Sequence, residues 1–261
     1  MRTSNPALNP NIFSDAAQGA FRGNSSEVMT VDGAVNKTGI LSLILILAAG
    51  YVWSLAFSTA GYDGAPAVAS NPGMLQPWIL GGGLGGFVLA LVTIFKKEWA
   101  PYSAPAYALL EGVFIGGLSA FFELRFPGIV MQASMLTVGT LVTMLMAYKA
   151  GVIKATEKFR SGVVMATGGI AFMYIMSLIL GFFGVNLPFL HGNGMISIGI
   201  SAVILVVAAL NLILDFDLIE QGARAQAPKY MEWYSAFSLM VTLIWLYLEF
   251  LRLLSKINSR D

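Results

Sequence analysis

Seven apolar segments, each long enough to cross the hydrocarbon core of a bilayer, dominate the chain. A spanning helix needs about 20 mostly apolar residues. Backbone polar groups must be paired internally in lipid, and the segments lack the ten-residue alternation of membrane strands, so we expect an all-α membrane protein. The predicted spans are residues 39–60, 76–95, 104–122, 129–149, 161–184, 194–216 and 232–255.

The composition excludes several classes of function. The chain is 57% hydrophobic and 11% charged, with a net charge of +1, so no nucleic-acid partner is expected. It has no cysteine and one histidine, which argues against a thiolate or multi-histidine metal centre and predicts no bound cofactor. Hydrolysis inside the membrane needs a Ser–Lys, Ser–His or paired-aspartate arrangement. The middles of the spans hold no lysine or histidine, so we expect that the protein is not an enzyme.

The first 38 residues differ from the rest. They are rich in Asn, Ser, Ala and Gly and lack the basic start and apolar core of a signal peptide. We expect a disordered tail over residues 1–38 and a transmembrane domain over residues 39–256. Most Lys and Arg residues flank one side of the predicted spans, which places the N-terminus in the cytoplasm.

Two stretches of the spans are rich in small residues. They are GGGLGGF, residues 81–87, and EGVFIGGLSA, residues 111–120. The first has no preceding strand and no following Lys-Ser or Lys-Thr, so it does not match a phosphate-binding loop. We expect both stretches to let helix backbones approach each other closely.

Five charged residues within the predicted spans or beside the end of one are singled out, because an ionised side chain at the bilayer centre costs about 2.5–3.5 kcal/mol to insert. Each of these residues is a candidate for a functional role unless a structural role explains it. Glu111 lies near mid-membrane. It is either a functional acid or a packing residue that desolvation keeps neutral. The five are Glu111, Asp215, Asp217, Glu249 and Arg252.

The sixth span ends with two aspartates in the sequence LDFDLI. Residues two apart on a helix point about 200° apart, so Asp215 and Asp217 cannot face one site together. Asp215 shares a face with Asn211, one turn earlier, and lies deeper, which favours a functional role. Asp217 is nearer the membrane edge, which favours an interfacial acid.

The last span carries Glu249 and Arg252 three residues apart in WLYLEFLRLL. This spacing allows an ion pair within the helix, which would leave Glu249 with a structural role. In the alternative, Arg252 extends toward the far headgroups and Glu249 is a functional acid. The residues leave both alternatives open.

The seven spans, LDFDLI in the sixth and YLEFLRLL in the seventh resemble the transmembrane Bax inhibitor motif (Bax inhibitor-1) family, in its bacterial branch. The resemblance covers about residues 39–256. It implies a seven-helix fold with the last helix central, and a pH-sensitive calcium leak across the membrane. The expected partners are then the lipid bilayer and the calcium ion. A carboxylate pair between the sixth and seventh helices would sense protons and admit the cation.

The resemblance assigns the first carboxylate to Asp215, as a transient calcium ligand, and leaves the second position open. Matching YLEF places it at Glu249, whereas matching the distal arginine at Arg252 places Thr242 there. Depth separates the two. Measured from the turn before the last helix, Glu249 would lie about 18 Å farther out than Asp215, and Thr242 about 8 Å, at the rise of an α-helix.

The resemblance also allows a second function, that of a non-transporting regulator. Such a protein would bind a membrane protease or another membrane protein, with the N-terminal tail as the contact. The expected location is the cytoplasmic (inner) membrane of a bacterium. The predicted proton-sensing and cation-conducting residues are Asp215, Glu249, Asp217 and Glu111, supported by Arg252, Thr242 and Asn211.

Overall fold

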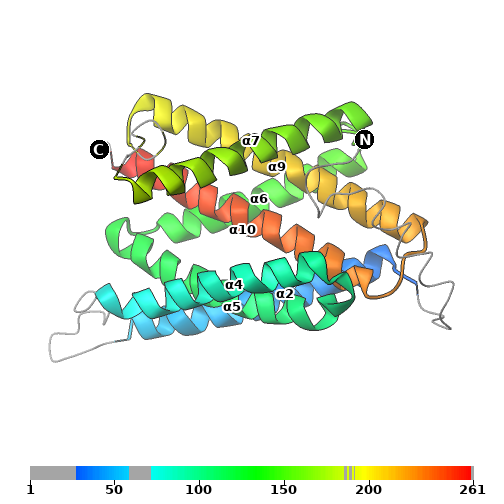
Figure 1. The fold of residues 1–261 in the computed structure, drawn as a ribbon, viewed down its shortest axis with the longest axis horizontal. Helices are drawn as coiled ribbons and strands as arrows, with labels where there is room; N and C mark the ends of the chain where they lie inside the picture. Colours follow the sequence, from blue (N-terminus) through cyan, green and yellow to red (C-terminus); the bar gives the residue numbers. More distant parts are fainter. Residues whose placement is uncertain (1–27, 59–71, 185–186, 188–189, 191, 260–261) are drawn as a thin grey trace. The chain divides into compact units, whose positions relative to one another are not determined.

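The computed structural model describes residues 28–58, 72–184, 187, 190 and 192–259. Within these ranges, seven helices are long and apolar enough to cross a membrane, which confirms the predicted all-α class and the seven spans (Figure 1). The helices are α2 (Val31–Ala56), α4 (Gln76–Phe95), α5 (Ala100–Arg125), α6 (Ile129–Lys149), α7 (Glu157–Phe182), α9 (Met195–Arg224) and α10 (Met231–Asn258).

The start of the first helix differs from the prediction. α2 begins at Val31, so it takes in residues 31–38, which the sequence pattern assigned to the disordered tail. The physical reason is a helix cap: the hydroxyl of Thr30 accepts a hydrogen bond from Gly33 N at 2.9 Å, and Asp32 lies in the positive first turn. Residues 1–27 of the predicted tail lie outside the described residues.

The sixth membrane helix is also longer than predicted. α9 continues to Arg224, eight residues past the predicted end at 216. Asp217 therefore lies within the helix and not at its end. The chain then turns at Gln226, whose positive φ of 52° marks the connection to α10.

The described residues fall into two compact units. One comprises residues 131–218 and 241–259, which we call the α7 unit. The other comprises residues 28–130 and 219–240, which we call the α5 unit. α9 and α10 each contribute residues to both units, and α10 has the largest buried share of the seven helices in the described ranges.

In the α5 unit, α5 packs against both α2 and α4, and the three run side by side (Figure 1). Glycines make this approach possible. A Cβ atom at Gly82 of α4 would lie 2.7 Å from Leu110 O of α5, and one at Gly116 of α5 would lie 2.5 Å from Ala49 O of α2. These contacts confirm that the glycine-rich stretches pack helices together.

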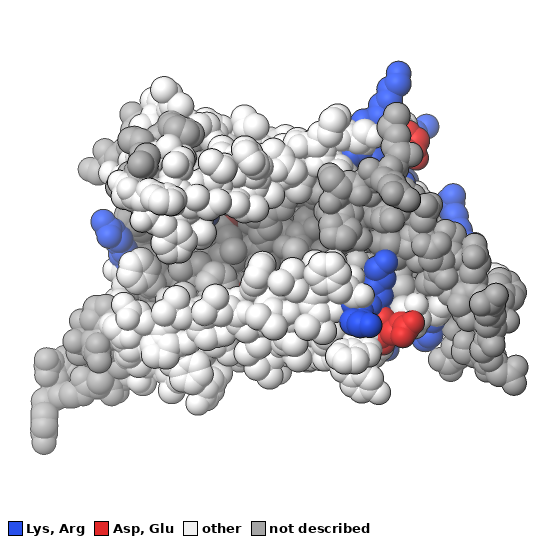
Figure 2. All heavy atoms as spheres, in the orientation of Figure 1, with Lys and Arg blue, Asp and Glu red and all other residues white. Residues whose placement is uncertain are grey.

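In the α7 unit, α7 and α9 pack through apolar side chains. Val163 and Val164 of α7 form a buried cluster with Leu214 of α9. On the face shown in Figure 2, nearly all described charged side chains lie at helix ends, and uncharged side chains cover the stretches between them. This distribution fits helices that lie in lipid.

Candidate functional site

Asp215 occupies a buried position on the face of α9 that also carries Asn211. The exposed fractions are 3% for Asp215 and 6% for Asn211. The amide of Asn211 donates hydrogen bonds to the Thr167 hydroxyl of α7 at 2.8 Å and to Val207 O at 2.9 Å. The structure therefore sets Asp215 one turn beyond a polar link between two spans. Burying a carboxylate this deeply costs free energy unless the group is paired or hydrogen-bonded.

Asp217, two residues on, belongs to a different contact. Its Oδ2 atom lies 2.5 Å from Nη2 of Arg160 in the first turn of α7. Both side chains are largely buried, whereas Glu157, which lies 3.9 Å from Arg160, is exposed. This ion pair compensates the charge of Asp217 and joins α9 to the beginning of α7. The spacing of Asp215 and Asp217 predicts that they point in different directions, and in the structure the two side chains lie in different surroundings.

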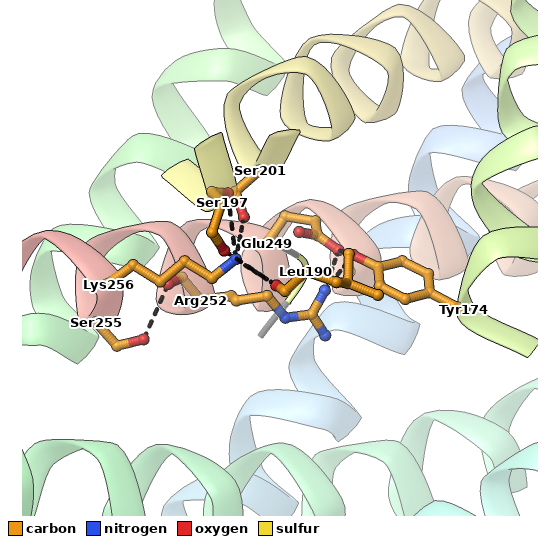
Figure 3. A network of polar contacts seen from close by, with 8 residues as sticks. All are labelled: Tyr174, Leu190, Ser197, Ser201, Glu249, Arg252, Ser255 and Lys256. Carbon is orange, nitrogen blue, oxygen red and sulfur yellow. Dashed lines mark hydrogen bonds and ion pairs between the residues drawn. The ribbon is translucent and has the colours of Figure 1, made fainter. Parts of the chain in front are cut away.

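Glu249 lies in a cluster with Tyr174 and Arg252, shown in Figure 3. The carboxylate is 1% exposed, and its Oε1 atom accepts hydrogen bonds from Tyr174 OH at 2.7 Å and from Arg252 Nη1 at 2.8 Å. The guanidinium group also donates to the Tyr174 hydroxyl and lies over the tyrosine ring, 4.9 Å from its centroid. Of the two alternatives that the sequence leaves open, the structure shows the ion pair within α10.

Lys256 forms a second buried contact on α10, seven residues beyond Glu249 (Figure 3). Its ammonium group donates to Leu190 O at 2.8 Å, to the Ser201 hydroxyl at 2.8 Å and to Ser197 O at 3.3 Å. Three acceptors match the three N–H donors of a charged ammonium group. Lys256 thereby holds the beginning of α9 to the end of α10.

The predicted site residues thus fall into separate groups. Thr242 is buried on α10 and lies seven residues, or about 10 Å of helix, before Glu249. Within the described part of the chain, Glu249 forms no hydrogen bond with Asp215. Glu111 belongs to the α5 unit, where a Cβ atom at Gly86 would lie 2.7 Å from its Oε1 atom.

Two polar partners of these acids, Arg160 and Tyr174, were not predicted from the sequence. The buried contact of Lys256 with Leu190, Ser197 and Ser201 was not predicted either. One signal for Lys256 was present, because Ser197 and Ser201 lie four residues apart on one face of α9. Over the described ranges, no three Asp, Glu, His or Cys side chains gather into a group that could hold a metal ion.

Comparison with known proteins gives one match. A family model described as "Bax inhibitor 1 like" matches residues 5–259, nearly the whole chain. The comparisons with curated proteins and with solved structures return no match. The site therefore has to be interpreted from its own geometry together with membership of this family.

Proposed function

Because the chain belongs to the Bax inhibitor 1 like family, we propose that this multi-pass membrane protein is a pH-sensitive cation leak channel that carries calcium. One observation supports this proposal above the others. Asp215, in the sixth membrane helix, is a carboxylate only 3% exposed. Ionisable groups at such positions mark ion pathways and proton relays in membrane proteins.

The proposed mechanism follows from the two charge states of Asp215. A deprotonated carboxylate offers a negative charge and hard oxygen ligands, which suit calcium. A protonated carboxyl group has lost this charge and is a much weaker ligand, so the leak falls as the pH is lowered. Over the described ranges, no three acidic or histidine side chains gather into a metal-binding group, so a calcium ion at Asp215 would keep most of its water molecules and be bound only transiently.

The other acids have supporting parts in this proposal. Asp217 and Glu249 each contact an arginine, so their charge is already compensated. A cation at either position would have to displace a guanidinium group. We assign these two acids to the field along the pathway, together with Glu111 in the α5 unit. Thr242 and Asn211 supply uncharged polar groups on α10 and α9.

The proposal includes the setting in which the protein works. We place it in the cytoplasmic membrane of a bacterium with its N-terminus in the cytoplasm, because Lys and Arg gather on the side of the tail. We also propose that it is not an enzyme.

A second function has one observation in its favour. Met29 N donates a hydrogen bond to Ala227 O at 2.7 Å, so the chain after the tail is held beside the turn between α9 and α10. A membrane protein that binds residues 1–27 would be presented at this turn. This supports a non-transporting regulator of a membrane protease or of another membrane protein.

Calcium flux into proteoliposomes, measured at several pH values, separates the two functions. The leak channel predicts flux that rises with pH in the purified full-length protein, and flux that persists after deletion of residues 1–27. The regulator predicts no flux above that of empty liposomes, together with loss of the bound partner after the same deletion.

A further inference from the structure

The first turn of α10 carries a carboxylate that is bound at the N-terminus of another helix. Glu232 is 0% exposed. Its Oε1 atom accepts hydrogen bonds from Thr30 N and from the Thr30 hydroxyl, both at 3.0 Å, and lies 3.0 Å from Lys229 Nζ. Thr30 is the N-cap of α2. Glu232 therefore occupies the place at the start of α2 where free N–H groups and the helix dipole favour a negative charge.

The backbone before α2 is fixed at the same place. Besides the bond from Met29 N to Ala227 O, Val28 and Pro228 form an isolated antiparallel bridge. The Met29 side chain is buried, and its sulfur atom lies 4.0 Å from the Ser235 hydroxyl oxygen of α10. Residues Val28 to Thr30 thus run along the turn that leads into α10.

A glycine completes this contact. Gly33 lies in the first turn of α2, and a Cβ atom there would overlap the Glu232 carboxylate. The φ angle of Gly33 is not positive, so the backbone conformation does not require glycine here. Glycine is required because a larger residue would overlap the Glu232 carboxylate. Gly33 and Glu232 therefore fit each other across two helices that are separated by about 200 residues of sequence.

We propose that residues Val28 to Gly33 form a strap that fixes the start of α10, and that Glu232 is a positioning residue for the polar side chains farther along this helix. α10 is continuous from Met231 to Asn258, so Thr242 and Glu249 lie on the helix whose start the strap fixes. The functional part of this inference rests on the proposed leak. The closed strap holds the leak low, and its release raises it.

A double-mutant cycle in thermal unfolding tests the strap itself. Gly33→Ala should lower the midpoint temperature of the full-length protein in detergent. Gly39→Ala is the matched control, because it adds the same methyl group to α2 where nothing lies within 4 Å. In the background of Glu232→Ala, the carboxylate is gone and Gly33→Ala should no longer lower the midpoint. If Gly33→Ala lowers the midpoint temperature equally with and without Glu232→Ala, the two residues do not interact and the proposed strap is wrong.

A reversible cross-link tests its effect on the leak. The chain has no cysteine, so Met29→Cys combined with Ser235→Cys introduces a single thiol pair across the contact. We expect several-fold lower calcium flux in the oxidised protein than in the same reduced protein, and several-fold higher flux in Gly33→Ala than in Gly39→Ala. The two single-cysteine variants should not respond to oxidation.

The failures of the two proposals are distinguishable. Equal flux in the oxidised and reduced forms, with an intact wild-type leak, would overturn the positioning role of Glu232. No flux in the wild-type protein would overturn the proposed function. The double-mutant cycle needs no flux, and it decides the strap in either case.

Discussion

Glu249 and Arg252 lie one turn apart on α10 and form an ion pair inside the last membrane span, with 2.8 Å between Oε1 and Nη1. One of the two alignments with the family's pattern places the second acid at Glu249, and this acid is bound by Arg252 of its own helix and by Tyr174. The other alignment places that position at Thr242, which is also buried and lies seven residues before Glu249 on α10.

Removing the arginine should expose the energetic role of this pair. Arg252→Gln leaves the carboxylate of Glu249 buried beside a neutral amide. We expect a loss of about 1–3 kcal/mol in the free energy of unfolding, measured by denaturant titration in detergent micelles. The loss is smaller than for a fully buried pair, because the Arg252 side chain is 38% exposed. The double variant Arg252→Gln with Glu249→Gln should recover much of this free energy. If the double variant is as unstable as Arg252→Gln alone, the pair is not held by a charge interaction.

The ion pair between Arg160 of α7 and Asp217 of α9 can be compared with an exposed ion pair within α9, between Arg224 and Glu220. The Arg160 and Asp217 side chains are 12% and 16% exposed, whereas those of Arg224 and Glu220 are 76% and 39% exposed. A double-mutant cycle should give a coupling free energy of about 1–3 kcal/mol for the buried pair and below about 0.5 kcal/mol for the exposed one. Equal couplings would show that the buried pair does not join α7 to α9 energetically.

Lys256 should stabilise the junction between α9 and α10 through its charge and donors. Lys256→Met leaves the Leu190 and Ser197 carbonyl groups without their donor, and we expect a loss of about 2 kcal/mol in unfolding free energy. Lys158→Met, at an exposed position, is the control and should change it by less than about 0.5 kcal/mol. A similar small change at both positions argues against the contact. Lys256→Arg keeps the charge and should lose less than Lys256→Met.

The glycine packing in the α5 unit has an adjacent control. Gly82→Ala places a methyl group against the backbone of α5, and we expect a loss of about 1–3 kcal/mol in unfolding free energy. Gly81→Ala adds the same group where nothing lies within 4 Å, so it should be neutral or slightly stabilising. If both variants are equally stable, α4 and α5 do not approach as closely as described.

The features predictable from sequence are those encoded within one segment. Spans 76–95 and 129–149 coincide with α4 and α6, because apolar length alone determines them. The start of α2 was missed because a polar cap, not apolar content, sets it. The partners Arg160 and Tyr174 were missed because each meets an acid more than 50 residues away. Such pairing depends on how helices are rotated and set against one another, which residue spacing within a helix does not encode.

In the proposed mechanism, protonation of Asp215 controls a cation leak. Its most direct test is calcium flux into proteoliposomes as a function of pH, for wild type, Asp215→Asn and Glu220→Gln. The last variant removes an acid from a more exposed position on the same helix and serves as the control. We predict flux that rises with pH in wild type and in Glu220→Gln, and that is weak and insensitive to pH in Asp215→Asn. Wild-type flux with an unchanged pH profile in Asp215→Asn would contradict the account.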